Sequence, residues 1–211
     1  MDERDEAELL EAWQDGETSA GEVLVRRHWS DLLRFFLAAT GGDRAASEDL
    51  AQETMLTVLR RRDAITSSFR AYCYGVARLK RHEAFRARTK DADHQPADEH
   101  GVVLAADEGI SEEDRQRCKL AISVLRRLDP DDQLLLVLKD YLGFTQPELA
   151  ETFKIKQSQV SGRINRARLR FRREFEALEQ TPEERDLTMR SLGSALASIV
   201  ARLPTDVGIA R

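Results

Sequence analysis

Two long stretches of the chain space their apolar residues as α-helices do, and the segment between them does not. Most of residues 1–90 and 114–178 place an apolar side chain every three or four positions, which lines one face of a helix. Residues 91–113 lack this period and carry eight acidic residues with no lysine or arginine. We therefore expect an all-α protein in which two small helical domains are joined by a flexible acidic linker.

Four helices are expected in the first domain, over residues 5–13, 23–39, 43–62 and 68–88. Gly16 and Gly21 are expected to flank a turn between the first helix and the second. The core stripes are expected to contain Leu50, Ala51, Met55, Val58 and Leu59 in the third helix, and Phe69, Tyr72, Cys73 and Val76 in the fourth.

The second domain carries clear helix-start signals after an amphipathic stretch at residues 114–128. Asp129 followed by Pro130 predicts an N-cap and the first residue of a new helix, which Gly143 ends. Thr145 and Glu148 have the spacing of a capping box. This next helix should end near Lys154, before a long helix over residues 158–178. Two helices joined by a tight turn, the second strongly basic, form the outline of a helix-turn-helix.

The overall charge of −5 hides two basic blocks. Residues 60–90 contain ten lysines and arginines against two acids, and residues 154–175 contain eight against one. Basic blocks of this kind attract polyphosphates and give salt-sensitive affinity. The alternative is an ordinary solvated helix face, but two such blocks on amphipathic helices favour nucleic-acid binding.

The last basic helix separates its apolar side chains from its arginines. Its apolar stripe begins at Val160 and ends at Leu178, and the arginines fall on another face. Amides and hydroxyls in its first turn can read base edges while guanidiniums hold phosphates. The expected DNA contacts are Gln157, Ser158, Gln159, Ser161, Arg163, Arg166 and Arg170. An αα-hairpin without DNA binding stays as the alternative.

Other classes of protein lack their usual signals. The two cysteines, Cys73 and Cys118, do not make a disulfide framework or a cysteine zinc site, and the histidines show no metal-ligand spacing. No nucleophile-elbow, phosphate-loop or zinc-protease motif is present, so neither catalysis nor a cofactor is expected. The acidic N-terminus has no apolar signal core, and no run of 18 apolar residues exists. A cytoplasmic protein without a membrane span is expected.

Four stretches of the sequence resemble the extracytoplasmic-function group of bacterial sigma factors, within the sigma-70 family. They lie in the same order as in that group, across about residues 20–178: Gly42-Asp43 leading into 47–55, Phe69 to Arg78, Leu128 to Gln133, and Glu148 to Ala150 continuing through Val160, Arg163 and 166–168.

The resemblance implies a sigma factor that binds core RNA polymerase and directs promoter-specific initiation. Residues 1–90 would bind core and melt the −10 element, and residues 114–178 would recognise the −35 element. The implied polymerase surfaces are the β′ clamp helices and the β flap. The implied site for the clamp helices is Asp43, Glu48, Asp49, Gln52 and Glu53, and the −10 set is Tyr74, Arg78, Lys80, Arg81, His82, Arg86 and Arg88. The seven residues expected to contact DNA in the last basic helix become the −35 set.

The sequence departs from the family pattern at a few positions. Leu79 stands where the family usually has Asn, and Lys154 where Gly is common in the turn. Leu79 and Gly162 would suit a sigma mimic that binds an anti-sigma factor without initiating transcription, whereas the basic blocks favour a true sigma factor. An anti-sigma factor is also an implied partner of the sigma factor itself. Residues 179–211 form an extension for which an amphipathic helix is expected.

Overall fold

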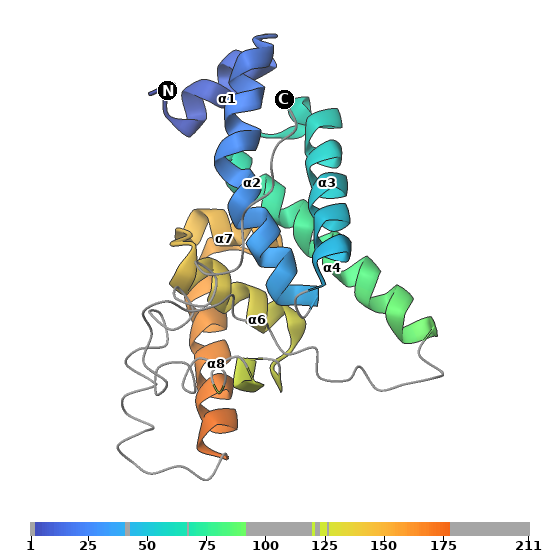
Figure 1. Ribbon diagram of the computed structural model, residues 1–211. Helices are drawn as coiled ribbons and strands as arrows, with labels where there is room; N and C mark the ends of the chain where they lie inside the picture. Colours follow the sequence, from blue (N-terminus) through green and yellow to red (C-terminus); the bar gives the residue numbers. More distant parts are fainter. Residues whose placement is uncertain are drawn as a thin grey trace, which may run out of the picture. The chain divides into compact units, whose positions relative to one another are not determined.

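The computed structural model describes residues 3–40, 43–66, 68–91, 120, 123–125 and 127–177 (Figure 1). All regular elements within these ranges are helical, which confirms the all-α prediction. The chain divides into two compact units, with α1 to α4 in the first and α6 to α8 in the second. The expected acidic linker, the C-terminal helix and most of the helix at 114–128 lie outside the described residues.

The first unit begins with two helices that pack together through a buried tryptophan. Helix α1 spans Glu6–Gln14, and Asp5 forms a capping box with Glu8 at its start. Helix α2 spans Thr18–Thr40. Gly16 lies in the turn between them with a φ of +107°, as the sequence predicts. The side chain of Trp13 is buried against α2.

Gly21 lies inside α2, and not at the edge of the turn that it was expected to flank. A Cβ atom at this position would lie 2.4 Å from Trp13 Nε1, a distance that real Cβ contacts do not show. The glycine is therefore needed for the close approach of the Trp13 indole to the α2 backbone. The sequence placed the start of α2 five residues too late, because a glycine that packing requires inside a helix has the same signature as a turn glycine.

Helix α3, Arg44–Arg60, buries part of the expected stripe together with two residues that were not expected there. Ala51, Met55 and Val58 are buried as predicted, but Leu59 is 38% exposed. The stripe is completed by two buried hydroxyl residues, Ser47 and Thr54. Both hydroxyls donate hydrogen bonds to helix carbonyls, Ser47 to Asp43 and Thr54 to Leu50. Such bonds let small polar side chains occupy core positions, which apolar periodicity does not detect.

A short 3₁₀ turn, Arg62–Ala64, leads towards α4, Phe69–Asp91. Phe69 and Cys73 are buried as expected, whereas Tyr72 and Val76 are half-buried. Glu6 of α1 ties the start of α4 to the rest of the unit. Its carboxylate accepts hydrogen bonds from the Ser68 hydroxyl at 3.1 Å and the Arg70 backbone N–H at 3.0 Å, and lies 2.8 Å from His28 Nε2.

The second unit confirms the predicted helix starts. Helix α6, Pro130–Leu136, has Asp129 as its N-cap, and α7, Gln146–Phe153, has the Thr145–Glu148 capping box. The five-residue π-helical turn η2, Val137–Tyr141, continues α6, and Gly143 follows with a φ of +65°. Helix α8, Gln157–Glu176, packs on both α6 and α7.

Candidate nucleic-acid interface

Helices α7 and α8 are joined by a tight turn that has one left-handed residue. Lys154 caps α7 with a φ of 52° and a ψ of 46°. The backbone N–H of the next residue, Ile155, donates to the Ala150 carbonyl at 2.9 Å, which closes the end of α7. Lysine is tolerated here at some cost, because a side chain disfavours the left-handed region. The predicted helix-turn-helix outline is therefore present in the structure.

The apolar stripe of α8 faces the interior of the unit, as predicted. All five of its described members are buried: Val160, Ile164, Ala167, Phe171 and Phe175. Leu178, the last predicted member, lies outside the described residues. Gly162 has open space beside it, since an added Cβ would meet only Arg166 Nη1, at 3.5 Å. Burial of the stripe fixes which faces of α8 remain at the surface.

The first turn of α8 exposes the polar side chains that were predicted to read bases. Gln157, Ser158, Gln159 and Ser161 are all exposed. Gln159 also accepts a hydrogen bond from the Lys156 backbone N–H at 3.1 Å, and Ser161 accepts one from Gln146 Nε2 at 2.9 Å. These two contacts hold the first turn of α8 in place.

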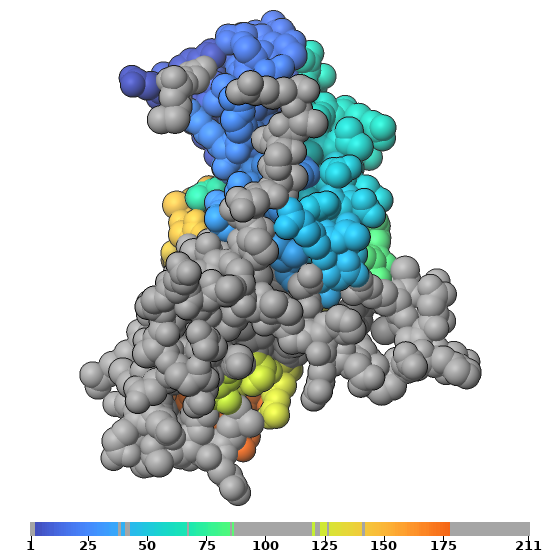
Figure 2. All heavy atoms as spheres, viewed as in Figure 1, coloured from blue at the N-terminus to red at the C-terminus, as the bar shows by residue number. Residues whose placement is uncertain are grey.

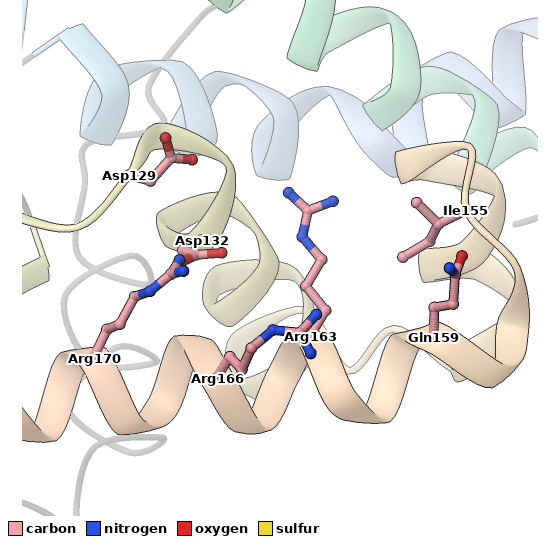
Figure 3. Close-up of a pocket in the computed structure, with 7 residues that line it drawn as sticks. All are labelled: Asp129, Asp132, Ile155, Gln159, Arg163, Arg166 and Arg170. Atoms are coloured by element: carbon pink, nitrogen blue, oxygen red, sulfur yellow. The ribbon is translucent and has the colours of Figure 1, made fainter.

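The three arginines predicted for DNA contact differ in their surroundings. They line a groove of about 310 Å³ together with Asp129, Asp132, Ile155 and Gln159 (Figure 3). Arg163 is half-buried, paired with Asp131 at 3.2 Å, and lies over the Phe153 ring at 4.8 Å. Arg170 is paired with the buried carboxylate of Asp132. Arg166 is exposed and makes no ion pair within the described residues.

Sequence reasoning missed the carboxylates that hold these arginines. Asp131 and Asp132 lie in the first turn of α6, and Asp140 in η2 pairs with Arg168 of α8 at 2.5 Å. The acidic residues after Pro130 were a visible signal, but their spacing to α8 along the chain is about 30 residues. Only the packing of α6 on α8 brings them together.

In the first unit, the residues predicted to bind polymerase lie along α3, whose side chains form part of the surface in Figure 2. Asp49 and Gln52 are exposed. Asp43 serves as the N-cap and accepts a hydrogen bond from the Ala46 N–H at 3.1 Å. Glu48 pairs with Arg44 at 2.8 Å. The residues thus form one acidic face, although several of its carboxylates already have partners in the chain.

Leu56 and Leu59 add apolar area to the surface of α3, which the sequence reasoning did not assign. Leu56 is 49% exposed and Leu59 is 38% exposed. Leu56 lies three residues after Glu53 and four after Gln52, which places it on the same helix face.

The −10 set on α4 is only partly at the surface. Tyr74, predicted to contact DNA, is instead 1% exposed, and its ring packs edge-on against Phe35 with centroids 5.7 Å apart. Arg78, Arg81 and His82 are half-buried, and Arg86 is exposed. The side chain of Arg88 lies outside the described part of the chain. Tyr74 is therefore a core residue, because the face of α4 that carries it packs on α2.

Lys80 joins the predicted −10 set to the predicted polymerase-binding set. Its Nζ donates to Glu53 Oε2 at 3.0 Å and lies 3.7 Å from Glu83. The hydrogen bond to Glu53 raises the pKa of Lys80 above its usual value. Lys80 remains charged at neutral pH, but part of its charge is neutralised within the unit.

Among the described residues, no cluster of three or more His, Cys, Asp or Glu side chains has the geometry of a metal site. The same part of the chain contains no helix with the length and apolarity needed to cross a bilayer.

Comparison with known families assigns both units. Residues 24–91 match the family described as Sigma-70 region 2, and residues 119–171 match Sigma-70, region 4. A solved structure of CnrH in complex with the cytosolic domain of CnrY has 23% identity, a TM-score of 0.58, and coverage of 82% of this chain and 99% of that one. The sigma factor RpoE, in complex with the anti-sigma factor NepR from Bartonella quintana, has 20% identity and a TM-score of 0.53, covering 72% of this chain and 94% of that one. None of the curated proteins compared with the chain matches it.

Proposed function

Since the chain belongs to the sigma-70 family, we propose that it binds core RNA polymerase and directs promoter-specific transcription initiation, as the extracytoplasmic-function group that it resembles does. In this proposal, residues 1–90 bind core and open the −10 element, residues 91–113 link the domains, and residues 114–178 bind the −35 element. The protein acts in the cytoplasm and catalyses no reaction of its own.

The observation that carries the proposal is the division of α8 into a buried stripe and an exposed polar first turn. Val160 and Ile164 anchor the helix in its unit, while Gln157, Ser158 and Gln159 remain exposed. Amides and hydroxyls at the start of a recognition helix can hydrogen-bond to base edges in the major groove. Arg166 supplies a positive charge for a phosphate. Ser161 belongs to the same surface.

The acidic face of α3 supports polymerase binding. We propose that Asp43, Glu48, Asp49, Gln52 and Glu53 face the β′ clamp helices, as the family resemblance implies. Carboxylates with apolar Leu56 among them suit a basic amphipathic helix, because charge complementarity sets the docking register and burial of Leu56 adds affinity. The β flap is proposed to contact the second domain.

Helix α4 is proposed to hold the −10 strand through Arg78, Arg81, His82 and Arg86. Lys80 also adds positive charge near the −10 strand, although it is bonded to Glu53. Arg88 belongs to the same basic run. The supporting feature is the excess of basic residues on this helix, which lowers the free energy of bringing a phosphate backbone near. Tyr74 is excluded from this set by its burial.

Reconstitution with core RNA polymerase tests the proposal directly. The protein and core enzyme are mixed and run-off transcription is measured on genomic fragments, with core alone as the control. Discrete transcripts that require the protein are expected. Tight core binding without transcripts would favour the sigma mimic, and absence of core binding would overturn the proposal that the protein is a sigma factor.

An anti-sigma factor is a further proposed partner. Two structural neighbours are complexes in which a related fold is bound by the cytosolic domain of CnrY or by NepR. Leu79, which is 50% exposed on α4, offers apolar area to such a partner. A Leu79→Asn variant should retain transcription and lose affinity for an anti-sigma protein, measured by titration of the purified pair.

A further inference from the structure

Half of the arginines on α8 form ion pairs with carboxylates of the second unit. The helix carries six arginines, Arg163, Arg166, Arg168, Arg170, Arg172 and Arg173. Arg163 is paired with Asp131, Arg168 with Asp140 and Arg170 with Asp132. The other three, Arg166, Arg172 and Arg173, are exposed and have no ion pair within the described residues.

The paired carboxylates are more buried than the guanidiniums they hold. The Asp132 side chain is 6% exposed and its partner Arg170 is 56% exposed. Asp140 and Arg168 differ in the same direction. Swinging Arg170 out to a phosphate would leave the Asp132 charge buried without a partner, which is strongly unfavourable. The pair is therefore expected to stay closed when an anion approaches.

We propose that Asp131, Asp132 and Asp140 limit the affinity of the protein for duplex DNA, by keeping Arg163, Arg168 and Arg170 from neutralising phosphates. The three remaining arginines then supply the charge of α8 that DNA can use. This inference rests on the proposed function, because it concerns the helix that would enter the major groove. According to this inference, Arg163 and Arg170, two of the predicted −35 contacts, stay paired with carboxylates of the protein and do not neutralise phosphates.

Geometry around Arg163 gives independent support. Its guanidinium lies over the Phe153 ring of α7 and is bonded to Asp131 of α6, so that it connects three helices. Stacking and ion pairing on two sides fix its orientation. The exposed Arg166 side chain lies one turn further along the same groove, without a carboxylate partner in the described residues.

The dependence of duplex affinity on salt tests the proposal, since each neutralised phosphate changes the slope of log K against log[salt] by about 0.9. The full-length protein is titrated with a fluorescent 25-base-pair duplex of random sequence at a series of salt concentrations. Arg166→Gln is expected to make the slope shallower by about 0.9. Asp132→Asn is expected to make it steeper by about the same amount, because Arg170 becomes available.

The matched control is the double variant Asp132→Asn with Arg170→Gln, which keeps the net charge of the wild type. If the pair is closed on DNA, the double variant has the wild-type slope. A double variant with a shallower slope would mean that Arg170 neutralises a phosphate in the wild type, and would overturn the proposal. An unchanged slope for Asp132→Asn would overturn it as well.

Asp132 is buried, and its substitution risks unfolding the second unit. The test is therefore repeated with a second set of variants. Asp140→Asn, and Asp140→Asn with Arg168→Gln, should follow the same pattern at a pair whose carboxylate is less buried than Asp132. If no variant binds duplex at any salt concentration, DNA binding through α8 is itself wrong and the inference fails with it. If the wild-type protein supports promoter-specific run-off transcription but Asp132→Asn leaves the slope unchanged, this inference fails while the proposed function stands.

Discussion

The Lys80 ammonium of α4 donates a hydrogen bond to the Glu53 carboxylate of α3 at 3.0 Å. This bond joins a residue predicted to touch DNA to one predicted to touch polymerase. Both side chains lie at the surface, with Glu53 the more exposed of the two. The pair therefore contributes little to the stability of the fold. Both charges remain accessible, Lys80 to DNA and Glu53 to polymerase.

Replacing Glu53 should affect polymerase binding more than folding. Glu53→Gln is expected to weaken core binding by roughly fivefold, on the order of 1 kcal/mol, and to change the free energy of unfolding by less than about 0.5 kcal/mol. Lys80→Met breaks the same bond but leaves the acidic face intact, so its affinity for core should not fall. Equal losses in both variants, measured by fluorescence titration with core enzyme, would show that the bond itself matters.

Adding one methyl group at Gly21 should destabilise the first unit. A Cβ atom there would lie 2.4 Å from Trp13 Nε1, and overpacking of this kind costs about 1–3 kcal/mol. Gly162→Ala is the matched control, since its Cβ has room and alanine favours a helix by about 1 kcal/mol. Thermal unfolding followed by circular dichroism should give a lower Tm for Gly21→Ala and a higher one for Gly162→Ala. A tolerated Gly21→Ala would contradict the packing of Trp13 on α2.

Acid should weaken the first unit through Glu6. Burial raises the pKa of Glu6, but hydrogen bonds from His28, from the Arg70 backbone N–H and from Ser68 outweigh it and lower the pKa from 4.5 to about 2. A carboxyl with a lowered pKa stabilises the folded state above its unfolded pKa, and this contribution is lost as the pH falls from 4.5 towards 2. Discounted for partial exposure, it is worth about 1–2 kcal/mol.

The test compares the wild type with Glu6→Gln in urea unfolding at pH 7, 4 and 2.5. Tryptophan fluorescence reports on the first unit, because Trp13 and Trp29, the two tryptophans of the chain, lie in α1 and α2. The gap in stability between the two proteins should narrow as the pH falls. A constant gap would mean that Glu6 is not held ionised by its partners.

Relieving the left-handed residue in the helix-turn-helix should stabilise the second unit. Lys154→Gly removes a side chain at a φ of 52°, which is expected to raise the stability by about 1 kcal/mol. Lys154→Ala removes the charge but keeps the Cβ, so it should show no such gain. The two variants are compared by thermal unfolding followed by circular dichroism, and equal Tm values would place the effect in the charge and not in the backbone.

Local chemistry made part of this structure predictable. Asp129 with Pro130, and Thr145 with Glu148, act within four residues of one another, so the sequence alone located the starts of α6 and α7. The buried stripe of α8 was also predictable, because helical geometry fixes which of its residues share a face.

Contacts between helices decided the rest. Gly21 is placed by the Trp13 indole, Tyr74 is buried by α2, and Arg163 is held by Asp131 across about 30 residues of chain. Periodicity reports which residues share a face but not which partner covers that face, nor which carboxylate reaches which arginine. The sequence therefore determined the helices, their caps and the presence of many cations. Packing determined which of these cations and aromatics can contact a partner, because burial and ion pairing depend on residues that only the fold brings together.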